Sequence, residues 1–278
     1  MKHEDKIKGA WKIFLFTEVA SLVVVIPYGW MMVKAFTTPE GAFTLSNWSF
    51  LYQETPFFRG LVLPVIWPSV ITSLIFASTT ALLQIGVTIP TAYTISRMQF
   101  RGRVQLTKLM IILDAFPTVA LLIGFFHVLN TIGLMNTYAG VVFVKVGMSL
   151  PGSIWLMKGF FDQVPWDIEW AAMVDGASRF TTFRKIIIAA VKPGSAVILV
   201  NSFLSGWAEY MLINLFIYSN GSTVSTFIGL MLDAEGKTAV PYGVMAAASL
   251  LYVLPVILLF IVSQKTLLKV SQGGSKQL

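Results

Sequence analysis

Four ionisable residues lie inside long apolar segments, where a charged side chain is costly. They are Glu18, Asp114, Lys145 and Glu209. Even on the mildest scale a charge at the centre of a bilayer costs about 2.5–3.5 kcal/mol, so such residues are functional candidates by default. Each could form a structural salt bridge, snorkel to a membrane surface or line the path of a polar solute. For Glu18 we favour the structural role.

Asp114 and Lys145 are candidates for pairing with each other. They fall on consecutive apolar segments that would run antiparallel across a membrane, but at different depths. A direct pair would therefore need a tilted helix or the full reach of the lysine. A structural role and a place on a solute path both remain open for these two residues.

The most polar stretch of the chain, residues 163–194, could instead bind another protein. Pro165 can open a helix, and Asp167 and Glu169 would then lie in its first turn, where the helix dipole favours acids. Gly176 can end that helix with a left-handed cap. One face would carry Ile168, Ala171, Ala172 and Asp175. The pattern predicts a short helix, a sharp turn and a second helix that re-enters the membrane.

The sequence lacks the residues that several other kinds of chemistry require. The chain has no cysteine, which excludes disulfides, thiolate metal sites and a thiol nucleophile. It contains no Gly-x-x-x-x-Gly-Lys-Ser/Thr loop for ATP, and His3 and His127 are too far apart to form a metal motif. We therefore expect no enzyme activity, no metal site and no cofactor in this chain.

The composition is that of a polytopic membrane protein. Of 278 residues, 56% are hydrophobic and 12% are charged, and the mean hydropathy is +0.76; a soluble domain carries about 25% charged residues. We expect a single all-α membrane domain over residues 1–278 with six transmembrane helices, each long enough for a hydrocarbon core of about 30 Å. The predicted spans are residues 13–33, 68–95, 106–129, 138–161, 186–217 and 243–262.

The positive charges are distributed unequally between the two sides of the predicted membrane domain. One side carries only Lys34, Arg59 and Lys237. The other carries Lys2, Lys6, Lys8, Lys12, Arg97, Arg101, Arg103, Lys108, Lys158, Arg179, Arg184, Lys185, Lys265, Lys269 and Lys276. The positive-inside rule then predicts that both termini and the polar stretch are cytoplasmic. Because the bases accompany apolar segments, the net charge of +7 does not indicate nucleic-acid binding.

The polar stretch resembles the EAA loop of ABC importer permeases. Ala171, Ala172 and Gly176 keep the spacing of that motif, and residues 175–177 match its Asp-Gly-Ala variant. Trp170 stands where the motif has an acid, with Glu169 one place early. Ala189 stands where a proline is usual, while Pro193 keeps the later one. The alternative is an ordinary amphipathic helix at the membrane surface.

Other segments extend the resemblance to carbohydrate importers of the maltose type. They are Asn47-Trp48, Ala92-Tyr93, the turn from Arg97 to Arg103 with its Phe-Arg-Gly, Trp207 to Tyr210, Pro255 and Gln264-Lys265. The chain resembles the smaller permease subunit of such an importer. The resemblance implies a type I importer permease with MetI-like architecture in a prokaryotic inner membrane.

The same resemblance implies the partners. They would be a second permease, two cytoplasmic ATPase subunits carrying ATP and Mg, and an extracytoplasmic solute-binding protein. The loop at 163–185 would be the coupling helix that docks on the ATPase. Its coupling residues would be Glu169, Trp170, Ala171, Ala172, Asp175, Gly176, Arg179 and Phe180. We expect Trp170 to anchor the loop by packing and Glu169 to supply the remaining acidic contact, unless Trp170 merely lies at the lipid–water boundary.

The fifth predicted span carries the strongest candidates for substrate contact. The stretch Trp207-Ala208-Glu209-Tyr210 resembles the Trp-Asn-Glu-aromatic stretch of sugar permeases, with Ala208 in place of the asparagine. Aromatic rings can stack on sugar faces and carboxylates can accept hydroxyl hydrogen bonds, although a Trp-Tyr interfacial belt is the alternative. The candidate pathway residues are Asp114, Lys145, Asn201, Trp207, Glu209 and Tyr210.

The resemblance leaves other transport functions open. The solute could be a sugar, an oligosaccharide, a polyol or another small polar molecule such as a glycerol phosphate. An ion-coupled secondary transporter would show broken helices in two matched halves, and we find no such pair. An accessory membrane protein would have no reason to keep the spacing of Ala171, Ala172 and Gly176.

Overall fold

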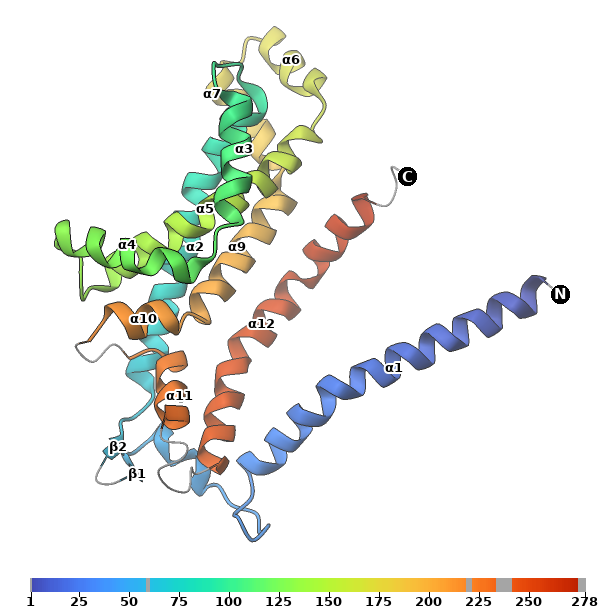
Figure 1. Ribbon diagram of the computed structural model, residues 1–278. Helices are drawn as coiled ribbons and strands as arrows, with labels where there is room; N and C mark the ends of the chain where they lie inside the picture. The colour runs from blue at the N-terminus through green and yellow to red at the C-terminus, as the bar shows by residue number, and fades with distance from the viewer. Residues whose placement is uncertain (1, 59–60, 219–221, 234–241, 275–278) are drawn as a thin grey trace. The chain divides into compact units, whose positions relative to one another are not determined.

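The computed structural model describes residues 2–58, 61–218, 222–233 and 242–274 (Figure 1). Arg59, Lys237 and Lys276, three of the bases that predict the orientation, lie outside the described residues, as does part of the polar loop at 218–242. The chain divides into two compact units, which are residues 1–67 with 227–255 and residues 68–226 with 256–278. The prediction of one membrane domain stays a prediction.

The first unit contains helix α1 (Lys2–Ala35), the 3-10 helix η1 (Ser46–Leu51) and a hairpin of β1 (Thr55–Phe58) and β2 (Leu61–Leu63). The two strands are antiparallel, with an irregularity between Pro56 and Phe58. Asn47 stabilises the turn after α1, because its side-chain amide donates to the carbonyls of Lys34, Ala35 and Thr37 at 3.0–3.3 Å. The resemblance had singled out this Asn47, and here it holds the end of the first span.

The second unit is built on two long helices, α2 (Trp67–Arg97) and α5 (Tyr138–Asp162). Between and after them come α3 (Arg103–Asp114), α4 (Thr118–Thr131), α6 (Trp166–Val174), α7 (Arg179–Thr182), the π-helical turn η2 (Phe183–Ile187), α8 (Ile188–Ala190), α9 (Lys192–Trp207) and α10 (Met211–Phe216). Figure 1 shows α6 and α7 at one end of this unit, well away from α10.

Two further helices have residues in both units. They are α11 (Val224–Asp233) and α12 (Tyr242–Gly274). With 10 residues, α11 is too short to span a membrane.

Small residues let α2 and α9 pack closely within the second unit. A Cβ atom on Gly206 of α9 would lie only 2.9 Å from the Cα of Ala77. Next to this contact, two apolar cores form. One surrounds Phe76, Leu129, Val141 and Phe216, and the other surrounds Tyr93, Met157, Phe161 and Ile187. Each core joins α2 to α5 and to a segment near one end of α9, so these helices form the frame of the unit.

The described residues contain four helical segments that are long and apolar enough to cross a membrane, or up to six if each of two bent pairs counts as one span. The four are Phe14–Ala35, Trp67–Arg97, Tyr138–Asp162 and Tyr242–Gln264. They coincide within two residues with the first, second, fourth and sixth predicted spans. The all-α architecture predicted from composition is confirmed.

The third predicted span, 106–129, was wrong as a continuous helix. The chain bends by 102° between α3 and α4, across residues 115–117. Pro117 is the cause, because it lacks an amide hydrogen and disfavours helical backbone in the residue before it. Its own ψ of 120° is extended, and α4 begins at the next residue.

The fifth predicted span, 186–217, was also wrong as one helix. The helical run from Arg179 to Ala190 and α9 meet at an angle of 73°, and Pro193 lies in the first turn of α9. A proline there cannot donate to the carbonyl four residues earlier, so the previous helix does not continue through it. At the other end α9 stops at Trp207, and a separate short helix, α10, follows.

Candidate functional site

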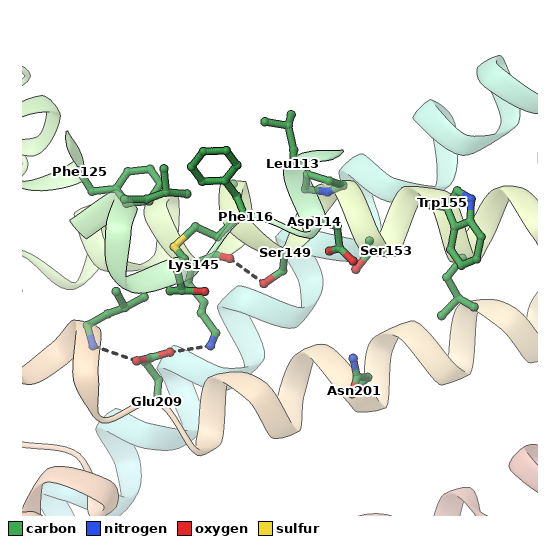
Figure 2. A pocket seen from close by; sticks show the side chains of 18 of the residues that line it. Leu113, Asp114, Phe116, Phe125, Lys145, Ser149, Ser153, Trp155, Asn201 and Glu209 are labelled. Carbon is green, nitrogen blue, oxygen red and sulfur yellow. Dashed lines mark hydrogen bonds and ion pairs between the residues drawn. The ribbon is translucent and has the colours of Figure 1, made fainter. Parts of the chain in front are cut away.

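A cavity of about 930 Å³ lies in the second unit, between α3, α4, α5, α9 and the start of α10 (Figure 2). Its polar lining consists of Asp114, Thr118, Lys145, Ser149, Ser153, Asn201 and Glu209. Aromatic rings of Phe116, Phe125 and Trp155 also line it. Such a mixture of charges, hydroxyls, an amide and aromatic faces suits a polar ligand that also presents apolar faces.

Helix α5 supplies one wall of the cavity through a helical repeat. Ser149 follows Lys145 by four residues, and Gly152 and Ser153 follow Ser149 by three and four, so all four residues share one face. Gly152 leaves room for the Asp114 side chain, because a Cβ atom there would lie 2.4 Å from Oδ1 of Asp114. The end of α3 can therefore approach α5 and place the Asp114 carboxylate in the cavity.

Lys145 pairs with Glu209. Its ammonium nitrogen lies 2.5 Å from Oε2 of Glu209, and the other carboxylate oxygen accepts the backbone N–H of Leu212 at 2.9 Å. Both side chains are largely buried. The pair thus ties α5 to the first turn of α10, and it leaves Asp114 as the acid beside Gly152. The sequence left a pair between Lys145 and Asp114 open, because it does not show where α9 ends. The end of α9 decides whether Glu209 can reach Lys145.

The structure brings together four of the six predicted pathway residues, namely Asp114, Lys145, Asn201 and Glu209. The other two are not among the residues that line this cavity. Trp207 is only 2% exposed and stacks on Phe203, with ring centroids 6.4 Å apart, and Tyr210 is half-buried. Their contact with a solute stays a prediction. Glu18 lies on α1 with an exposed side chain.

Sequence reasoning missed the serines and aromatic rings of the cavity. Ser149 and Ser153 follow Lys145 at four and eight residues, so the helical repeat from the intramembrane lysine could have identified them. The rings of Phe116, Phe125 and Trp155 carry no such signal, because aromatic residues are common throughout the apolar segments.

The predicted short helix and turn of the EAA-like loop are present as α6 and Gly176. Gly176 has φ of +87°, and the backbone N–H of Ala177 donates to the carbonyl of Ala172 at 3.0 Å, which closes a left-handed cap. Ser178 then opens α7, where its hydroxyl accepts the backbone N–H of Thr181 at 3.2 Å. The turn residues therefore reverse the chain between α6 and α7.

Large apolar side chains of this loop point away from the rest of the chain. Trp170 is 54% exposed, Val174 is 86% exposed and Phe180 is 69% exposed. Ala172, on the opposite side of α6, is buried. The exposed side chains are candidates for a protein interface, because clusters of exposed apolar residues mark such sites.

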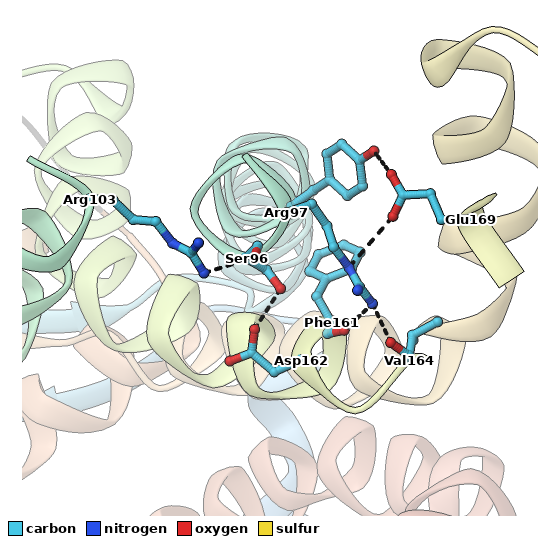
Figure 3. A network of polar contacts seen from close by, with 8 residues as sticks. Ser96, Arg97, Arg103, Phe161, Asp162, Val164 and Glu169 are labelled. Atoms are coloured by element: carbon cyan, nitrogen blue, oxygen red, sulfur yellow. Dashed lines mark hydrogen bonds and ion pairs between the residues drawn. The ribbon is translucent and has the colours of Figure 1, made fainter. Parts of the chain in front are cut away.

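Glu169 faces the interior of the second unit, about 100° round α6 from the exposed Trp170. Its side chain is fully buried, and Oε1 accepts a hydrogen bond of 2.6 Å from the Tyr93 hydroxyl (Figure 3). Arg97 lies on its other side, with Nε 3.7 Å from Oε2. The role of Glu169 in ATPase contact stays a prediction, and the structure gives its carboxylate partners inside the chain. The roles of Ala171, Asp175, Arg179 and the other predicted coupling residues likewise stay predictions.

The ion pair in the cavity predicts a non-additive pair of substitutions. Lys145→Met and Glu209→Gln should each destabilise the assembled protein by about 3–5 kcal/mol, because each leaves one charge buried without its partner. The double variant should be more stable than either single one, since glutamine can still accept the N–H of Leu212 and no charge remains. Thermal unfolding of the purified assembly measures this, and losses that simply add would contradict the pairing.

Comparison with known proteins agrees with this geometry. Residues 85–269 match the family described as "Binding-protein-dependent transport system inner membrane component". The chain is 30% identical to the trehalose/maltose transport permease MalG of Thermococcus litoralis, over 92% of each chain. It is 28% identical to the maltodextrin transport permease MdxG of Bacillus subtilis, over 95% of each.

The fold matches a solved transporter as well. A chain of a bacterial ABC transporter involved in the import of the acidic polysaccharide alginate superposes with a TM-score of 0.74 at 18% identity, over 94% of this chain and 97% of that one. At that identity the likeness shows the fold. Together with the family match over most of the second unit, it confirms the resemblance carried by the EAA-like loop. The chain belongs to the family of inner membrane components of binding-protein-dependent transport systems.

Proposed function

We propose that this chain forms, with a second permease, the membrane pathway of an ATP-driven importer for a sugar, an oligosaccharide or a polyol. The observation that carries the proposal is one helix, α5, which lines a polar and aromatic cavity along its length and ends beside the EAA-like loop. The names of the relatives, which are permeases for maltodextrin and for trehalose and maltose, support a carbohydrate as the solute.

The chemistry of the cavity suits a carbohydrate. Carboxylates such as Asp114 and the amide of Asn201 can exchange hydrogen bonds with hydroxyls, and the ring of Trp155 offers a stacking face. The paired charges of Lys145 and Glu209 offset each other. A solute would therefore meet hydrogen-bonding groups distributed over several helices.

The proposed partners are a second permease, an extracytoplasmic binding protein that delivers the solute, and two cytoplasmic ATPase subunits that hold ATP and Mg. Membership of a binding-protein-dependent transport family supports them. The chain itself would take no part in hydrolysis. The distribution of positive charges supports an orientation with both termini in the cytoplasm, which places α6 and α7 on the ATPase side.

A transport assay tests the proposal. In liposomes that contain the full assembly and the binding protein, maltodextrin uptake should require hydrolysable ATP and should be unchanged when proton and sodium gradients are collapsed. A non-hydrolysable ATP analogue is the matched control. Uptake that follows an ion gradient and continues without ATP hydrolysis would show that the chain is a secondary transporter instead.

Trp170 provides a prediction about docking. Its indole is exposed on α6, and a buried interface tryptophan commonly contributes about 2 kcal/mol or more to binding. Trp170→Ala should therefore weaken ATPase binding roughly thirtyfold. Because the contact is apolar, the loss should be nearly the same at low and high ionic strength. Titration of the ATPase onto the purified permeases at two salt concentrations measures it.

Trp155 is a matched control for that experiment. It is also 54% exposed, but it lies on the cavity wall of α5 rather than on the loop. Trp155→Ala should leave ATPase affinity unchanged. Wild-type affinity in a correctly inserted Trp170→Ala variant would mean that Trp170 lies at the lipid–water boundary and contacts no partner.

A further inference from the structure

Arg97 lies where three segments of the second unit meet. It is the last residue of α2 and is only 4% exposed. One terminal nitrogen of its guanidinium donates to the carbonyl of Phe161 at 2.7 Å and to that of Val164 at 2.5 Å (Figure 3). The guanidinium carbon also lies 4.4 Å from the ring centre of Trp166, over its face. Arg97 therefore contacts the last turn of α5, the connection after it and the first residue of α6.

Glu169 supplies the negative charge for this buried guanidinium. The two side chains are 1% and 0% exposed, and Nε of Arg97 lies 3.7 Å from Oε2 of Glu169, an ion pair too long for a direct hydrogen bond. The Tyr93 hydroxyl holds the other oxygen at 2.6 Å. Since Tyr93 and Arg97 are four residues apart, they lie on the same face of α2, and both contact Glu169 of α6 from there.

A second set of contacts holds the end of α5 to the end of α2. The Ser96 hydroxyl donates to Oδ1 of Asp162 at 2.6 Å, and Lys158 lies 2.5 Å from the other oxygen of that carboxylate. Arg103, at the start of α3, donates to the carbonyl of Ser96 at 2.9 Å. The two helix ends are thus joined through both neighbouring residues, Ser96 and Arg97.

Glu169 is fully buried, so its carboxylate is not accessible to a partner protein: Oε1 accepts the Tyr93 hydrogen bond, and Oε2 faces Arg97 without a hydrogen-bond partner among the described residues. Turning this carboxylate outward would break the Tyr93 hydrogen bond and would leave the Arg97 charge buried without its counter-ion, an arrangement that proteins strongly disfavour. The neighbouring Trp170 is about 100° further round the helix, and its side chain is exposed. Glu169 therefore makes its contacts inside the chain, whereas the Trp170 side chain is exposed to a partner.

We propose that Tyr93, Arg97 and Glu169 are positioning residues that fix α6 to the ends of α2 and α5, so that the loop moves as a rigid extension of α5. Contact with the ATPase is then left to the exposed apolar side chains Trp170, Val174 and Phe180. The proposal rests on the proposed function, because it assumes that α6 docks on an ATPase.

Helix α5 connects the positioning residues Tyr93, Arg97 and Glu169 to the cavity. α5 is continuous from Tyr138 to Asp162, and its cavity face carries Lys145, Ser149 and Ser153. A displacement of α6 that is passed to Phe161 and Asp162 would therefore move the part of the cavity wall that lies beyond Pro151, which includes Ser153 and Trp155. If the cluster were loose, the ATPase could still bind α6, but its motion would be lost before it reached α5.

The experiment separates docking from transmission. Glu169→Ala and Arg97→Ala should each leave ATPase affinity within about twofold of wild type at low and high salt, and should lower the number of solutes transported per ATP hydrolysed about tenfold. The double variant should be no worse than the more defective single one, because the two residues act as a unit. Glu169→Gln, which keeps the Tyr93 hydrogen bond, should recover part of the ratio.

Asp167→Asn is the matched control. Asp167 is an exposed acid on the same helix, so its variant should change neither the transport ratio nor the ATPase affinity. Salt-dependent loss of ATPase affinity in Glu169→Gln, with a normal transport ratio in Arg97→Ala, would overturn the proposal and make Glu169 a docking residue.

A readout without partners keeps this test distinct from that of the proposed function. In the purified chain, backbone amides of α6 should exchange hydrogen about tenfold faster in Arg97→Ala than in wild type, while those of α9 should be unchanged. Unchanged exchange in α6 would overturn the positioning role. Faster exchange in a protein that neither binds an ATPase nor transports would support the positioning role and reject the proposed function.

Discussion

A buried guanidinium at the end of α2 requires hydrogen-bond acceptors and a counter-ion, and neighbouring segments of the second unit supply both. Arg97 receives one carbonyl oxygen from the last turn of α5, one from the connection after it, a carboxylate from α6 and an aromatic face from Trp166. An unpaired charge there would be strongly destabilising, so three segments must meet at this point in one geometry. The position and direction of the EAA-like loop follow from that constraint.

Helix α5 is held by hydrogen bonds at its loop end and by an ion pair further along. At the loop end the carbonyl of Phe161 accepts from Arg97 and the carboxylate of Asp162 accepts from Ser96, and further along Lys145 pairs with Glu209, just before α10. The cavity lies between these contacts, against α3, α4 and α9. The segment of α5 from Pro151 to Asp162 carries Ser153 and Trp155 in the cavity wall, so a displacement at its loop end can reach the cavity. Pro151 itself removes one backbone hydrogen bond of the helix.

The sequence predicted local structure well where a residue type determines the backbone. Gly176 required a left-handed turn, and the spacing of Ala171, Ala172 and Gly176 identified the loop and the family. Bends were missed, because hydropathy cannot distinguish a straight span from one broken at Pro117 or Pro193. The partner of Lys145 and the inward direction of Glu169 depend on contacts between distant segments, which no local spacing encodes.

The most direct test of this account is a distance between α5 and α6 in the working transporter. Spin labels can be placed at Gly159→Cys and Asp167→Cys, two exposed positions in a chain without native cysteine. The space around the Gly159 Cβ position is open, so a label fits there. Pulsed electron paramagnetic resonance should give the same distance distribution in the nucleotide-free and ATP-bound assemblies. A distribution that shifts between these states would show that α6 moves independently of α5 and would contradict the account.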